Sequence, residues 1–163
     1  MLLSLVWLLR VVTSPGMPEL GRAKGTHVFR EIESHPDDEL VPGVVALRLD
    51  GALFFVTADS LEDRIDELII SADHAATGVV FDLQSVVFID SQGASKLAEI
   101  ADNLHARGLS FKLARVKPGV MTVLERDGIV DRIGPENIHL DVHEAVKALA
   151  RTSHPVPADG SVS

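Results

Sequence analysis

The sequence predicts an α/β domain in which a mixed β-sheet is flanked by about four α-helices. Short apolar runs of strand length alternate with longer segments whose apolar residues recur every three or four positions, as on one face of a helix. Two of the runs contain no polar residue, as in strands that are covered on both faces. Strands come first and strand–helix units follow, an order typical of helices packed in layers on a sheet.

The first part of the domain should consist of strands. Residues 26–32 and 44–49 have strand composition, and residues 52–56 are predicted to form a third strand. Asp50-Gly51 lies between the last two strands and indicates a tight hairpin turn.

A helix and two buried strands should follow. Asp59 is the predicted N-cap residue of the helix, with Glu62 three positions later. Apolar residues at helical spacing form its buried face: Leu61, Ile65, Leu68, Ile69 and Ala72. Residues 79–81 and 86–89 are the unbroken apolar runs, and each is predicted to be a strand.

The next pair of elements is a second helix and a strand. The helix has its apolar face within residues 94–104, and Gly108 is well placed to terminate it. Apolar and polar residues alternate over residues 109–113, which predicts a strand with one face in water.

Two further helices are expected near the C-terminus. Pro118 and Gly128 mark the start and the end of the first. A short strand is expected at Ile138 and Leu140. Asp141 should then cap a final helix with Glu144 at its third position, and the buried face of that helix comprises Val142, Ala145, Val146 and Leu149.

Residues 1–12 are predicted to be the cytoplasmic end of a truncated transmembrane helix. The apolar run at residues 2–9 is too short to cross a bilayer by itself, which takes about 20 apolar residues. A secretory signal has its basic residues before the apolar run, whereas the first basic residue here, Arg10, follows it. Trp7 and Arg10 suit the inner membrane interface. A short amphipathic or disordered leader is the alternative.

Composition also sets the limits of the folded domain. Residues 13–25 are rich in proline and glycine and are predicted to be a linker. Residues 152–163 should form a disordered tail. The domain itself is therefore expected to span residues 26–151.

The charge distribution argues against a nucleic-acid partner. The formal net charge of the chain is −9. Residues 1–25 carry three basic residues and one acidic residue, so the remainder holds a net charge of −11. Phosphate backbones require a basic surface. The absence of cysteine excludes thiolate metal sites and disulfides.

One loop has the chemistry of a candidate site. A predicted buried strand runs directly into Asp90-Ser91-Gln92-Gly93 and then into an amphipathic helix. The first N–H groups of a helix lack internal partners and favour negative charge. Ser91 is therefore well placed to carry a phosphate, and Gly93 would allow close approach of a ligand or another chain. Asp and Ser are also favoured helix caps, so the tetrapeptide could simply start a helix.

The order of segments along the chain resembles the STAS domains that sulfate transporters share with anti-sigma factor antagonists. The central match is residues 79–93, and further matching segments lie at residues 107–108, 116–120, 124–128 and 144–146. Residues 20–22, 25–30 and 42–55 are similar to the linker and first strands of the SulP transporter version.

This resemblance implies the STAS fold, a mixed sheet with helices on one side. It also implies that Ser91 matches the serine that a partner kinase phosphorylates in anti-sigma factor antagonists. A guanine or adenine nucleotide is a candidate weak ligand, held by helix N-terminal amides of Asp90–Gly93 together with Thr57, Pro118 and Gly119. Gln92 and Thr57 depart from the family pattern, because a small hydroxyl residue and Asn are common at these positions.

The resemblance further implies a cytoplasmic regulatory domain of a SulP-type sulfate or other anion transporter, on the inner face of the membrane. Its partners would be the transporter membrane domain, a regulatory protein, and a second copy through the full-length transporter. The alternative is a free-standing anti-sigma factor antagonist that is switched by phosphorylation at Ser91.

An enzyme is not expected. Asp82 and Asp90 follow predicted strands and could suggest a magnesium site, but a solvated or capping role is favoured for Asp82. His139 and His143 should be separated by a strand–helix junction, so no metal site is predicted. The sequence contains no phosphate-binding loop and no serine-hydrolase or zinc-protease motif.

Overall fold

The computed structural model describes residues 3–4 and 15–153 of the chain. The elements follow one another in the order β1 (Leu20–Arg22), β2 (Phe29–Glu31), β3 (Val44–Arg48), α2 (Phe55–Ser71), β4 (Gly78–Asp82), α3 (Ser91–Ala106), β5 (Ser110–Ala114), α4 (Pro118–Arg126), α5 (Ile129–Ile133), a 3-10 turn (Pro135–Asn137), β6 (Ile138–His139) and α6 (Val142–Ser153).

The main sheet has four parallel strands in the order β3-β4-β5-β6. A separate antiparallel ribbon of β1 and β2 lies at its β3 edge, where Glu19 pairs with Leu47 and Gly16 pairs with Asp50 in antiparallel bridges. Parallel and antiparallel pairing therefore coexist, and the predicted mixed α/β architecture is confirmed.

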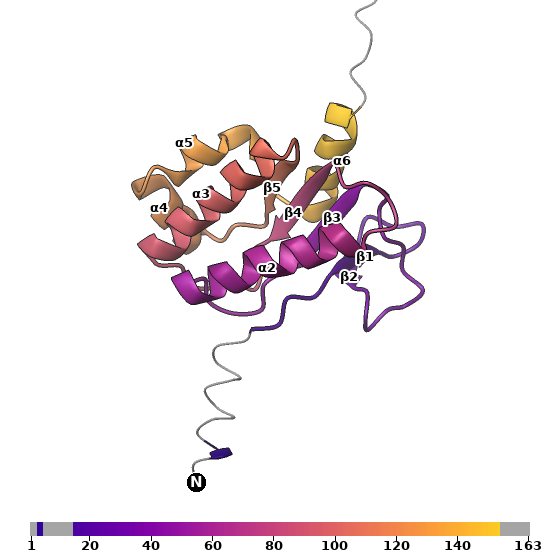
Figure 1. The fold of residues 1–163 in the computed structure, drawn as a ribbon, viewed down its shortest axis with the longest axis horizontal. Coiled ribbons are helices and arrows are strands. Elements are labelled where there is room, and N and C mark those ends of the chain that lie inside the picture. The colour runs from indigo at the N-terminus through magenta and orange to yellow at the C-terminus, as the bar shows by residue number, and fades with distance from the viewer. Residues whose placement is uncertain (1–2, 5–14, 154–163) are drawn as a thin grey trace, which may run out of the picture.

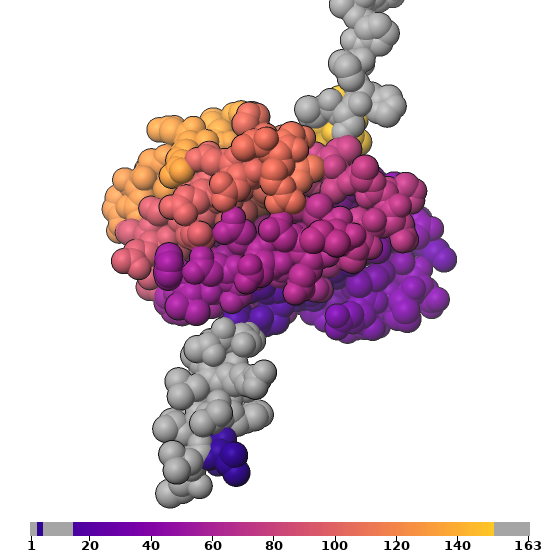
Figure 2. Space-filling view, viewed as in Figure 1, coloured from indigo at the N-terminus to yellow at the C-terminus, as the bar shows by residue number. Residues whose placement is uncertain are grey.

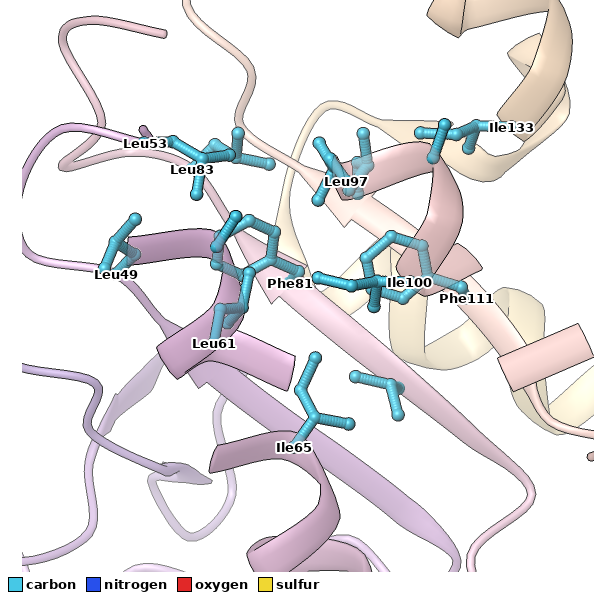
Figure 3. Close-up of a cluster of buried hydrophobic side chains, with 14 of the residues drawn as sticks. Leu49, Leu53, Leu61, Ile65, Phe81, Leu83, Leu97, Ile100, Phe111 and Ile133 are labelled. Atoms are coloured by element: carbon cyan, nitrogen blue, oxygen red, sulfur yellow. The ribbon is translucent and has the colours of Figure 1, made fainter. Parts of the chain in front are cut away.

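Helices cover both faces of the main sheet (Figure 1). Strand side chains alternate between faces. Those on one face, including Phe81 and Phe111, pack against α2 and α3, and Figure 3 shows Phe81 near Leu61 of α2 and Phe111 beside Ile100 of α3. The other face packs against α6 through residues such as Val80 and Ala114. The expectation of helices on one side only is thus wrong, because α6 has its own apolar stripe to bury.

The strand predicted at residues 52–56 is wrong. The helix α2 begins at Phe55, four residues before the predicted cap at Asp59. The Phe54 N–H donates to Thr57 Oγ1 at 2.7 Å, so a threonine inside the first turn satisfies a helix-end donor. Gly51 has a φ of 157° and no hairpin forms around it.

Residues 86–89 do not form a strand of the sheet either. Only Ile89 pairs, in a single parallel bridge with Leu53. Val86 and Ile89 are buried, but Val87 and Phe88 are 72% and 52% exposed. The apolar run therefore contributes two side chains to the core and two to the outer surface of the domain.

Three smaller differences concern the C-terminal half. Lys112 is buried, so the predicted wet face of β5 is covered, and its Nζ donates to Asn137 Oδ1 at 2.6 Å. The short helix α5 follows Gly128 directly, which terminates α4 and caps α5 at a φ of 71°. Leu140 lies outside β6 and is exposed.

The other predicted elements agree with the structure. The fully buried strand β4 and the helices α3, α4 and α6 lie where the sequence predicts them. Asp141 Oδ1 accepts from the Glu144 N–H at 2.8 Å, as the predicted cap requires. Figure 2 shows how side chains of α2 and of α3–α5 close over the sheet on the face in view.

Residues 15–25 differ from the linker that the sequence predicts. They contain β1, and Leu20 is buried against the α6 side of the core. Leu20 thus joins a ribbon even though the composition of this segment indicates a loop. The predicted leader lies outside the described residues except for Leu3 and Ser4, as does the predicted tail beyond Ser153. Within the described part, the helices are too short or too polar to span a membrane.

Candidate functional site

The predicted loop begins the helix α3. Asp90 is its N-cap residue, and its Oδ1 accepts from the Gly93 N–H at 2.6 Å. Ser91 and Gln92 are exposed in the first turn. The capping role therefore belongs to Asp90, and the Ser91 hydroxyl is free for another partner.

Gly93 is required by the fold and not by a ligand. A Cβ atom at this position would lie 2.2 Å from the Leu53 carbonyl oxygen, which is a severe clash. The Leu53 N–H donates to the Phe88 oxygen at 3.0 Å and holds the two segments together. The close approach that the sequence indicates is therefore made by the chain's own backbone.

Ser91 is adjacent to an ion pair from the far end of α4. Arg126 Nη2 donates to Ser91 Oγ at 3.1 Å, and Arg126 Nε lies 2.8 Å from Asp127 Oδ1. Hydrogen bonds from Arg126 and then Ser91 hold the pKa of the Asp127 carboxyl below its usual value. A serine with a neighbouring guanidinium at a helix N-terminus can accommodate added negative charge.

A shallow hollow of about 440 Å³ lies beside Ser91, and its lining includes Phe55 and Lys96. Lys96 Nζ lies 3.2 Å from Asp59 and 3.3 Å from Glu62. These carboxylates raise the pKa of Lys96, and their negative charges offset the positive charge of its ammonium group. Arg126 and Lys96 are therefore both engaged with carboxylates, which disfavours strong phosphate binding beside Ser91.

Exposed apolar side chains lie beside this loop, among them Phe55, which lines the same hollow as Ser91. We call the set the apolar end of the domain; its members are Phe54, Phe55, Val56, Val87 and Phe88. The rings of Phe54 and Phe88 are in contact, with centroids 5.6 Å apart. The sequence did not indicate this surface, because residues 52–56 were predicted to be a hairpin strand and residues 86–89 a buried strand. Two adjacent short apolar runs, each beside a helix cap, were the available signal.

The remaining predicted site residues do not join the loop. Thr57 is buried, and its hydroxyl bonds to the backbone of Phe54 and Ala52. Pro118 and Gly119 begin α4, whereas Arg126 ends it, about 12 Å further along the helix axis. The structure thus brings Asp90–Gly93 together with Arg126 and Asp127, which the sequence did not indicate.

Asp82 is neither solvated nor a cap. It is fully buried, and its carboxylate accepts both Nε, at 2.9 Å, and Nη2 of Arg115. The Gln84 N–H adds a third hydrogen bond at 3.1 Å. This pairing is structural, and no group of three metal-ligating residues occurs within the described part of the chain.

Comparison with known proteins places this geometry in a family. The family model of the STAS domain matches residues 35–145. Probable sulfate transporter 4.2 of Arabidopsis thaliana is 28% identical, over 88% of this chain and 23% of its own length. Probable sulfate transporter MT1781 of Mycobacterium tuberculosis is 30% identical, over 91% of this chain and 27% of its own length. The chain thus spans about a quarter of the length of these relatives.

Solved structures support the same fold. The murine Slc26a9 anion transporter superposes with a TM-score of 0.78 at 14% identity, over 90% of this chain and 24% of its own. The SulP transporter STAS domain of Vibrio cholerae gives 0.57 at 24% identity, over 75% and 91% of the two chains. The anti-sigma factor antagonist SpoIIAA gives 0.54 at 21% identity, over 69% and 93%.

Sequence and fold therefore lead to one conclusion. The family match covers most of the described residues, and it includes the strand β4, the Asp90–Gly93 loop and the helix α3. The predicted resemblance to SulP-type STAS domains is confirmed by the sulfate transporters among its relatives. The chain belongs to the STAS domain family.

Proposed function

We propose that the chain is the cytoplasmic regulatory module of a SulP-type transporter of sulfate or another anion, and that it acts by binding and not by catalysis. The observation that carries the proposal is the similarity to sulfate transporters over about nine-tenths of this chain. The transporter membrane domain would be its main partner. Pairing of two modules would occur through the full-length protein.

The Ser91 loop is the proposed control point. Ser91 is exposed, and it lies at the positive end of α3 within hydrogen-bond distance of Arg126. Phosphorylation adds nearly two negative charges beside the Arg126–Asp127 pair and the positive end of α3, so it would alter the charge of this exposed loop. The modification would therefore change what the loop binds.

Anion uptake by the full-length polypeptide tests this role. Ser91→Asp and the wild type would be expressed in cells that lack sulfate uptake, and Ser34→Asp would introduce the same charge at another exposed serine. We expect Ser91→Asp to change the uptake rate at equal membrane abundance, with Ser34→Asp unchanged. Equal uptake by all three proteins would contradict control through Ser91.

A free-standing anti-sigma factor antagonist is the second candidate, which the fold similarity to SpoIIAA supports. That protein would bind an ATP-using partner kinase, and Ser91→Asp should abolish the binding. Co-purification of such a kinase with the wild type but not with Ser91→Asp would favour this candidate over the transporter module.

Weak binding of a guanine or adenine nucleotide is a further prediction. Its phosphates would use the Ser91 and Gln92 amides at the start of α3, beside the Gly93 N–H that Asp90 already holds, against the acidic character of the domain. Amide shifts at Gln92 and Gly93 in millimolar nucleotide are the expected signal. Unchanged shifts at both residues would exclude it.

A further inference from the structure

We propose that the apolar end of the domain is the surface that docks on the cytoplasmic side of the transporter's membrane domain. The inference rests on the proposed function, because it takes that membrane domain as the partner. It adds which face of this chain makes the contact and what chemistry the partner must present.

The apolar end brings five exposed apolar side chains to one end of the domain. Its three phenylalanines and two valines are between 41% and 72% exposed. Contiguous exposed apolar patches of this kind mark interaction sites, because water contact with so much apolar area is unfavourable. Aromatic residues are also the side chains that contribute most to binding at interface centres.

The patch is held in shape by the backbone. Leu53 and Ile89 form a parallel bridge and are both buried. Their neighbours Phe54 and Phe88 are exposed, and the two rings are in contact. Two segments more than 30 residues apart in sequence thus form one ordered surface. Binding of a partner would therefore cost little conformational entropy in this domain.

The chain enters the fold close to the apolar end. Gly16 pairs with Asp50, and a Cβ at Gly51 would lie 3.2 Å from the Pro15 side chain. Gly51 is three residues from Phe54. In Figure 1 the chain enters beside the start of α2, while α6 ends on the opposite side of the domain.

This entry point limits what can cover the patch. Five residues, 10–14, separate the apolar run at residues 2–9 from Pro15, and they span at most about 18 Å. If that run ends a membrane helix, the tether holds this end of the domain close to the membrane domain. An attachment at the end of α6 would have favoured the opposite face.

Charge beside the entry point indicates the partner's chemistry. A groove of about 630 Å³ is lined by residues 15–18 and by five carboxylates, those of Glu31, Glu33, Asp50, Asp63 and Glu67. Arg64 in this lining pairs with Glu67, and Arg48 pairs with both Glu31 and Asp50, so the excess negative charge comes from Glu33 and Asp63. Cytoplasmic loops of membrane proteins are rich in Lys and Arg. An apolar surface on the partner would pack against the apolar end, and basic loops beside it would face the acidic groove. Anionic lipid headgroups would be repelled by the carboxylates of the groove.

Cysteine labelling tests the docking face, because the chain contains no native cysteine. Phe88→Cys and Phe55→Cys would be placed in the full-length polypeptide in membranes with an exposed cytoplasmic side. Ile70→Cys is the matched control, since Ile70 is exposed on the same helix as Phe55 and about 22 Å along its axis. A polar maleimide would measure reactivity relative to the urea-denatured protein.

We expect Phe55→Cys and Phe88→Cys to react at least about tenfold more slowly than Ile70→Cys. Equal reactivity of the three in a polypeptide recovered with the membranes would overturn the docking inference alone. Recovery of the polypeptide in the soluble fraction would overturn the proposed function as well. Protection that disappears in a detergent that keeps the transporter folded would identify lipid as the partner and would also overturn the inference.

Discussion

Two glycines at the starts of α3 and α4 differ in whether a larger side chain would fit. Gly93 faces the Leu53 carbonyl, whereas a Cβ at Gly119 would meet no atom within 4 Å. We expect Gly93→Ala to lower the free energy of unfolding by about 3 kcal/mol, because the backbone must shift to relieve the clash. Gly119→Ala should be neutral or raise it by up to about 1 kcal/mol. Urea denaturation measures both, and equal effects would contradict the packing described for Gly93.

Asp90 and Ser91 are adjacent but have separable roles. Only Asp90 caps α3. Asp90→Ala should therefore destabilise the domain by about 1 kcal/mol, while Ser91→Ala should stay within about 0.5 kcal/mol of the wild type. A larger cost at Ser91 in thermal unfolding would make it a structural residue and weaken its proposed role as a control point.

The ends of β4 and β5 are joined by the ion pair of Asp82 and Arg115. Arg115 has a φ of 55°, the one positive value among described residues other than glycine, so its backbone is in the left-handed region. Arg115→Met would leave the Asp82 carboxylate buried without its partner, and we expect a loss of about 3–5 kcal/mol in the free energy of unfolding. The double variant Asp82→Leu with Arg115→Met is the control and should recover much of that loss. A single variant as stable as the wild type would contradict this account.

Regular elements of the fold could be predicted because local signals and burial agreed. The continuous run of β4, the proline that begins α4 and the cap at Asp141 each indicated the element that forms. The strand predictions for residues 52–56 and 86–89 were wrong for a common reason. Their apolar residues serve the core and an outward surface at once, and hydrophobicity alone cannot separate these two uses.

The candidate site was predicted in part for a similar reason. The Asp90–Gly93 loop follows a recognisable strand and cap, so the sequence located it. Arg126 and Asp127 reach Ser91 from 35 residues away in sequence, and only the packing of α4 brings them there. The pairing of Asp82 with Arg115 likewise depends on strand register, which no local pattern specifies.

The stability of the whole domain should fall in mild acid partly through His139. Its Nε2 is buried without a hydrogen-bond partner in the described structure, and burial, with the nearby Lys112 charge, lowers its pKa from 6.5. Between the two pKa values the unfolded chain therefore binds a proton at His139 that the folded state does not bind. The contribution of neutral His139 to the free energy of unfolding is present above pH 6.5 and is lost as the pH falls through the folded pKa. His139→Gln should flatten the pH dependence of urea denaturation below pH 6.5. A parallel dependence in both proteins would exclude His139 as a source.

Fractionation of native cells tests the central claim, that this domain is part of a membrane transporter. An antibody raised against residues 26–151 would be used on the membrane and soluble fractions. The account predicts a band much larger than the 17.5 kDa of this chain, in the membrane fraction alone. A soluble band at 17.5 kDa would contradict it and would favour the free-standing antagonist.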